Sequence, residues 1–162
     1  MSNSTNSGKV NPVNSERELL SKIIQEEIIP SCCNGNKAAE AYLKRMFFIV
    51  RLLDDIQDED YKVEKSDIIK GYFLLLGDIA TNKFYKEHQD MLIAIHIVSF
   101  NAWQDSNSWE NDISKTKRLY AHVIRDYICE LFSLVAYLNG GEKLMRKVSI
   151  KIRSAFVKEI GE

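Results

Sequence analysis

Five acidic side chains crowd the stretch RLLDDIQDED, which covers residues 51–60. They are Asp54, Asp55, Asp58, Glu59 and Asp60. In a helix, residues four apart lie on one face with their Cβ atoms about 6 Å apart, so Asp54 and Asp58 could ligate one hard divalent cation. The spacing DDxxD is therefore suited to holding Mg²⁺ and, through the metal, a diphosphate.

The same stretch resembles the first aspartate-rich motif of the trans-isoprenyl diphosphate synthases. The segment LLLGDIA, residues 74–80, adds to the resemblance, because that family also places an apolar helix ending in Gly-Asp after its motif. The resemblance covers about 30 residues. It implies an all-helical fold in which Asp54, Asp55 and Asp58 bind Mg²⁺ and a substrate diphosphate. YKVEKS stands where the family has an arginine pair, and DDxxD does not recur in this chain.

A second interpretation of the acidic run is a solvated or partner-facing surface. The run closes a predicted helix, where acidic groups meet the negative end of the helix dipole and need an opposing charge. Lys62 and Lys65 are the nearest candidates in the sequence. Because the motif lacks its second half, the sequence favours an acidic edge that docks on a basic partner over a catalytic site.

Three other polar groups are candidates for chemistry. His122, Asp126 and Glu130 lie four apart, as in helix-bundle metal sites, but no Glu-x-x-His pair accompanies them, so we predict a stripe of ion pairs. His96 lies within LIAIHIVSF and is predicted to be a hydrogen-bonded core residue. Asp78 is expected either to cap the segment starting at Ile79 or to pair with a cation such as Arg51 or Lys44.

Two tryptophans, Trp103 and Trp109, flank QDSNS in a predicted long loop. Aromatic side chains beside a polar loop suit a protein interface, and they equally suit anchoring of the loop to the core. The basic segment 142–159 is predicted to be an amphipathic helix docked on the bundle with its cations outward. Contact with a membrane or nucleic acid is the alternative for that segment.

The elements that position these residues are predicted to be helices, because apolar residues recur three and four apart. The first helix is expected to begin at the cap Ser15 and to stop at Pro30, and SCCNGN is expected to form a turn. Further helices are predicted over 37–57, 66–80, 88–103 and 115–138. The last of them is followed by the helix stop NGG and the basic helix. The helix over 66–80 is apolar nearly all round, so we expect it to be central. The sequence predicts an all-α, single-domain bundle of five to six helices over residues 15–162, after a flexible tail at 1–14.

Composition limits the classes of function. The chain has 162 residues, of which 45% are hydrophobic and 28% charged, as suits one domain. A net charge of −1 gives no basic excess for direct binding of nucleic acid. Three cysteines in no disulfide or zinc spacing, and no apolar run long enough to span a membrane, predict a cytoplasmic protein.

The favoured hypothesis is a small cytoplasmic interaction protein without a cofactor. It would bind and neutralise or regulate a partner protein with a basic surface, such as a toxin or nuclease, as immunity proteins and inhibitors do. The acidic run, from Asp54 to Asp60, and the two tryptophans would contact the partner. The alternative is an isoprenoid-synthase-like domain that binds Mg²⁺ and a diphosphate through Asp54, Asp55 and Asp58.

Overall fold

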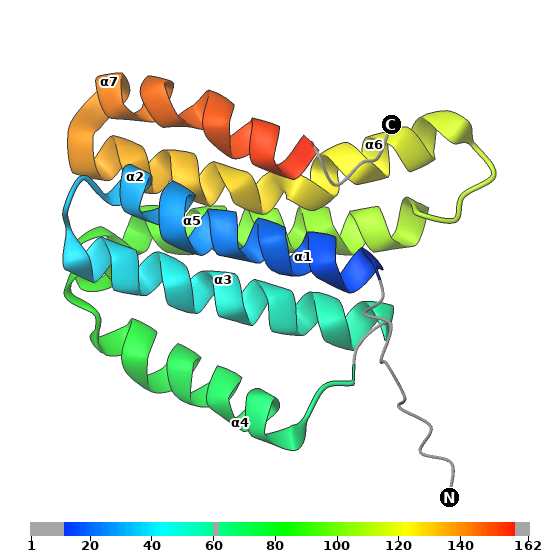
Figure 1. Cartoon of the computed structure of the whole chain (residues 1–162), viewed down its shortest axis with the longest axis horizontal. Coiled ribbons are helices and arrows are strands. Elements are labelled where there is room, and N and C mark those ends of the chain that lie inside the picture. The colour runs from blue at the N-terminus through cyan, green and yellow to red at the C-terminus, as the bar shows by residue number, and fades with distance from the viewer. Residues whose placement is uncertain (1–11, 60–61, 158–162) are drawn as a thin grey trace, which may run out of the picture.

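The computed structural model of the chain describes residues 12–59 and 62–157, and every regular element in them is a helix (Figure 1). The elements in chain order are α1 (Pro12–Ile23), the π-helical η1 (Ile24–Ile28), α2 (Ile29–Cys33), α3 (Lys37–Asp58), α4 (Lys65–Phe73), the π-helical η2 (Leu74–Ile79), α5 (Lys83–Trp109), α6 (Lys115–Arg125), the 3-10 segment η3 (Asp126–Ile128) and α7 (Cys129–Val157). The predicted all-α bundle of five to six helices is confirmed, since several of these elements join end to end into longer rods.

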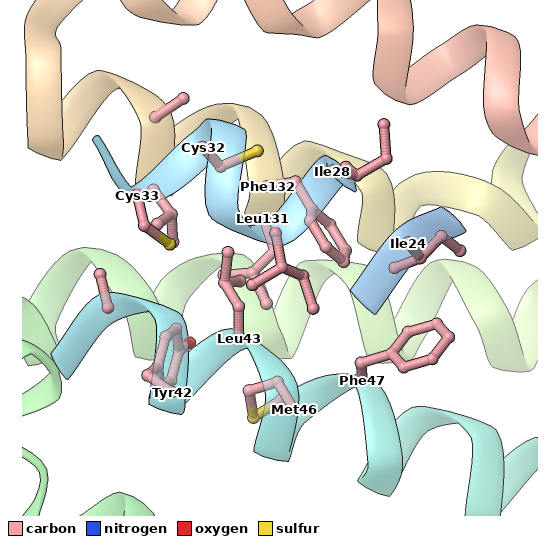
Figure 2. Close-up of a cluster of buried hydrophobic side chains, with 14 of the residues drawn as sticks. Ile24, Ile28, Cys32, Cys33, Tyr42, Leu43, Met46, Phe47, Leu131 and Phe132 are labelled. Carbon is pink, nitrogen blue, oxygen red and sulfur yellow. The ribbon is translucent and has the colours of Figure 1, made fainter. Parts of the chain in front are cut away.

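The core lies where the first rod, made of α1, η1 and α2, meets α3 and the first half of α7 (Figure 2). Ile24, Cys32 and Cys33 enter it from the first rod, and the almost completely buried Tyr42 and Leu43 enter it from α3. All three cysteines of the chain are buried. Burial raises the pKa of the Cys32 thiol to about 11, so this side chain acts as a packing group.

The first rod does not stop at Pro30, contrary to the prediction, but continues to Cys33. Proline lacks an N–H and its ring clashes with the carbonyl four residues earlier. The wider π-helical turn η1 directly precedes α2 and relieves that clash. The rod ends at Asn34 and Gly35, which have φ of 48° and 82°, so only these residues of the predicted turn SCCNGN lie in a left-handed turn.

The same rod begins earlier than predicted. α1 starts at Pro12, so Ser15 lies inside the helix and is not its cap, and residues 12–14 of the predicted tail are helical. Residues 1–11 lie outside the described part of the chain. α3, in contrast, follows its prediction closely, because the Asn36 side chain accepts hydrogen bonds from the N–H groups of Ala38 and Ala39 at its start.

The rod formed by α4 and η2 lies at the edge of the molecule, not at its centre (Figure 1). Gly71 and Leu74, three residues apart, face α3, and a Cβ atom at Gly71 would come within 2.8 Å of the Leu52 side chain. The prediction of a central helix was wrong. Apolar residues all round a helix indicate that burying several of its sides would be favourable, but they do not show that other helices of this chain pack on those sides. The helix begins at Lys65, after Glu64, one residue before its predicted start.

α5 continues through most of the predicted loop and ends at Trp109. The hydroxyls of Ser106 and Ser108 donate to the carbonyls of Trp103 and Gln104, at 2.7 and 3.1 Å, so these polar side chains bond to their own helix instead of breaking it. Residues 110–114 form the actual loop.

The chain reverses within α7 at Gly141, as NGG predicted, where φ is 65°. Its ψ is −165°, and only glycine adopts this combination of φ and ψ without strain, so the two halves of α7 fold back on each other at this position. Beyond the reversal, Val148 and Ile152 are buried. The basic helix therefore docks on the bundle.

Candidate functional site

The acidic run lies at the end of α3, where it was predicted. Its three aspartates point in two directions: Asp54 and Asp58 face α5 and α6, and Asp55 faces α1. Glu59 is exposed and caps α3 with a φ of 54°. Asp60 lies outside the described residues. The run is therefore not one uniform acidic surface.

Arg125 at the end of α6 gathers acidic groups from two other parts of the fold. Its Nη2 lies 3.0 Å from Oδ1 of Asp58 and 3.9 Å from Oδ1 of Asp54, and its Nη1 lies 3.6 Å from Oε1 of Glu110, which follows α5. Burial acts to lower the pKa of Arg125, but the three carboxylates outweigh it and raise the pKa above its ordinary value. We call Arg125 and these three carboxylates the arginine clamp.

Asp55 has its own arginine. Arg17 of α1 donates a hydrogen bond to the Asp55 carboxylate and forms an ion pair with it. All three aspartates of DDxxD therefore meet arginines of the same chain. The predicted local cation Lys62 pairs instead with Glu64, at 2.7 Å. Sequence reasoning missed Arg17 and Arg125, which lie 38 residues from Asp55 and 67 residues from Asp58.

The DDxxD aspartates as arranged do not fit a magnesium site. The Arg125 guanidinium stands against Asp54 and Asp58, the two carboxylates that would share a cation, and Asp55 points toward α1. Among the residues that the structure describes, no group of three or more His, Cys, Asp or Glu side chains could hold a metal ion. Magnesium binding at this position stays a prediction, and it would require Arg17 and Arg125 to move away from the aspartates.

The two tryptophans lie on α5, not in a loop, and both are half-buried. The indole N–H of Trp103 donates to Asp54 at 3.3 Å, and its ring stacks on Phe100. Trp109 packs against Tyr120 of α6 with ring centroids 6.0 Å apart. Trp103 therefore belongs with the arginine clamp, whereas Trp109 fastens α5 to α6.

The predicted core histidine has a buried partner. The phenol oxygen of Tyr42 lies 2.5 Å from Nε2 of His96, which confirms the predicted hydrogen bond. The ring of His96 also stacks on the ring of Tyr42, with centroids 6.0 Å apart. His96 therefore links α5 to α3 as a packing group.

Two of the remaining polar candidates, Asp78 and Glu130, form ion pairs. Asp78 is exposed and pairs with Arg45 at 2.8 Å, a cation that was not among the predicted ones. Within the stripe His122, Asp126 and Glu130, the helix changes to a 3-10 turn at Asp126, so the regular spacing is interrupted. Glu130 pairs with Arg153 at 2.6 Å.

An apolar groove lies beside the arginine clamp, between η2, α3 and α5. It holds a pocket of about 300 Å³. Leu53 of α3, Leu75 of η2 and Phe100 of α5 line it, with Trp103 and Arg125 also contributing. Apolar side chains therefore form most of its surface, and a few polar groups border it, as in many binding sites.

The outer side of α4 and η2 carries a continuous set of exposed apolar side chains, which we call the outer apolar face. It consists of Ile68, Ile69, Tyr72, Phe73, Leu75 and Leu76. These residues form two adjacent stripes with helical spacing, opposite the side of the rod that Gly71 and Leu74 turn to α3. Phe73 is 73% exposed and Leu76 is 77% exposed, so the face is open to water at its middle.

An exposed apolar stripe on α5, which we call the α5 wall, meets the groove at Phe100. Ile93, Ile97 and Phe100 of α5 are spaced four and three residues apart and are all exposed. Leu75 belongs to the outer apolar face and Phe100 to this wall, and both line the pocket, so the two surfaces are continuous across the groove. Exposed apolar patches beyond a few hundred Å² on a folded protein indicate an interaction site.

Comparisons with protein-family models, with curated proteins and with solved structures find no match to this chain. Within the described residues, no helix combines the length and the apolar character that crossing a membrane requires. The arginine clamp, the groove and the outer apolar face are therefore the features that bear on function.

Proposed function

We propose that this chain is a protein-binding helical module that docks a partner on the outer apolar face and in the groove beside it. The observation that carries the proposal concerns the helical rod formed by α4 and η2. Its apolar residues lie both on the side that packs on α3 and on the outer apolar face, and the outer apolar face is exposed. Placing a helix of a partner in an apolar groove is a common mode of recognition, with anchors at helical spacing. The exposed face and the pocket supply both the area and the hollow that this mode needs.

The acidic run has a structural part in this proposal. Arg17 holds Asp55, and the arginine clamp ties the end of α3 to α5 and α6. A basic partner would have to compete with both arginines for the same carboxylates. Neutralisation of a toxin or nuclease through this run therefore stays a prediction, and the apolar surface has the stronger support.

Photo-crosslinking tests the proposed surface even when the identity of the partner is unknown. A photoreactive amino acid replaces Leu76 in the full chain inside cells, and Ile150 of α7, which is 73% exposed, is the matched control position. We expect a discrete adduct from position 76 and none from position 150. Because Phe73 lies one turn from Leu76 on the same face, adding Phe73→Asp should abolish the adduct.

Two results would contradict the proposal. One is the absence of any adduct at position 76 in cells and in purified protein. The other is an adduct that persists unchanged with Phe73→Asp, because a charged residue in the centre of a genuine apolar interface must weaken it.

A further inference from the structure

We infer that the partner on the outer apolar face is a second copy of this chain, so that α4 and η2 of each copy lie in the groove of the other. This inference rests on the protein-binding function proposed above and names its partner. A two-fold pair of this kind requires that one chain carry both complementary surfaces. Here the exposed stripes and the apolar groove lie side by side on the same rod and its neighbours.

The exposed apolar area matches what a stable dimer needs. The six residues of the outer apolar face and the three of the α5 wall are between 39% and 77% exposed. Aromatic side chains bury about 150–250 Å² each and Ile and Leu are somewhat smaller, so the nine side chains at these exposures present on the order of 800 Å². A standard interface buries about 800 Å² on each partner, so these side chains supply most of one partner's share.

Charge does not oppose self-association. The chain has a net charge of −1, so two copies repel each other weakly. Within residues 68–76, the segment of the outer apolar face, the one charged residue is Lys70, and its Nζ lies 4.2 Å from the centre of the Phe48 ring on α3. The exposed Lys70 side chain therefore leans over α3 and does not extend across the outer apolar face.

The two end segments outside the described residues are poor in apolar side chains. Residues 1–11, MSNSTNSGKVN, contain two large apolar residues, Met1 and Val10, and residues 158–162 contain one, Ile160. Segments of that composition bury too little apolar surface to fill a groove of this size. A second copy, in contrast, brings six large apolar side chains on one rod.

Sedimentation of the purified full chain tests the inference. We expect a dimer with a Kd on the order of 1 µM or tighter, as suits an interface of this size. Leu76→Asp should raise the Kd at least tenfold, because it places a charge in the centre of the interface. Ile150→Asp, at a position of similar exposure on α7, should leave the Kd unchanged. A wild-type chain that sediments as a monomer, or a dimer indifferent to Leu76→Asp, would overturn the inference.

The crosslinking experiment separates this inference from the function it rests on. An adduct of twice the chain mass from position 76 in purified protein supports both. A monomeric chain that gives an adduct of a different mass in cells overturns the second copy and leaves protein binding in place. No adduct under either condition overturns both.

Discussion

Arg125→Met is expected to destabilise the chain by about 2 kcal/mol, between the cost of losing an exposed ion pair and that of breaking a buried one. The Arg125 side chain is 24% exposed and lies against Asp54, Asp58 and Glu110. Methionine keeps much of the length and apolar area, so the loss reports the charge. The substitution removes the guanidinium, so the three carboxylates stay near one another and repel each other.

Arg153→Met is the matched control for this prediction. Arg153 pairs with Glu130 at 2.6 Å, but its side chain is 56% exposed, so its loss should cost no more than about 1 kcal/mol. Both variants are compared with the wild type by urea unfolding at neutral pH. Adding Asp58→Asn to Arg125→Met should recover part of the lost stability. Equal losses for the two arginine variants would show that the clamp is an ordinary surface pair.

Acidification should destabilise the chain through His96. Burial lowers the pKa of His96 from 6.5 to about 4. Between these values the unfolded chain binds a proton at His96 and the folded chain does not, so stability is full above pH 6.5 and falls as the pH falls toward 4. A shift of this size corresponds to about 3 kcal/mol. Burial also raises the pKa of Tyr42, so its phenol stays protonated and is able to donate to the neutral imidazole.

The measurement is the free energy of unfolding by urea from neutral pH down to pH 4. His96→Gln keeps an acceptor for Tyr42 but has no proton to gain, so it should flatten the pH dependence over this range. His122→Gln, which changes an exposed histidine of α6, should keep the wild-type slope. The account of His96 fails if His96→Gln retains the full loss of stability on acidification.

The helices were predicted best from the sequence where a local signal marked their ends. Asn36 starts α3 by capping it, and Gly141 ends the first half of α7 with a left-handed φ, and both boundaries were expected. Pro30 misled the prediction because its cost is absorbed by π-helical geometry in the preceding turn, which leaves no pattern in the sequence. Ser106 misled it because a serine can bond to its own helix as readily as to a loop.

The candidate site was predictable only in part. DDxxD correctly marked a place where charges concentrate, but the partners of these charges are distant in sequence, and only the fold brings Arg17 and Arg125 to them. The outer apolar face was visible as a helix that is apolar nearly all round. The spacing of apolar residues shows which sides of a helix are apolar, but the packing of the other helices decides which of those sides are buried.

The central claim is that the outer apolar face, and not the acidic run, contacts the partner. The most direct test compares photo-crosslinking from position 76 with photo-crosslinking from position 59, because Leu76 and Glu59 are both exposed and represent the two surfaces. We predict an adduct from position 76 and none from position 59. An adduct from position 59 with none from position 76 would contradict the claim.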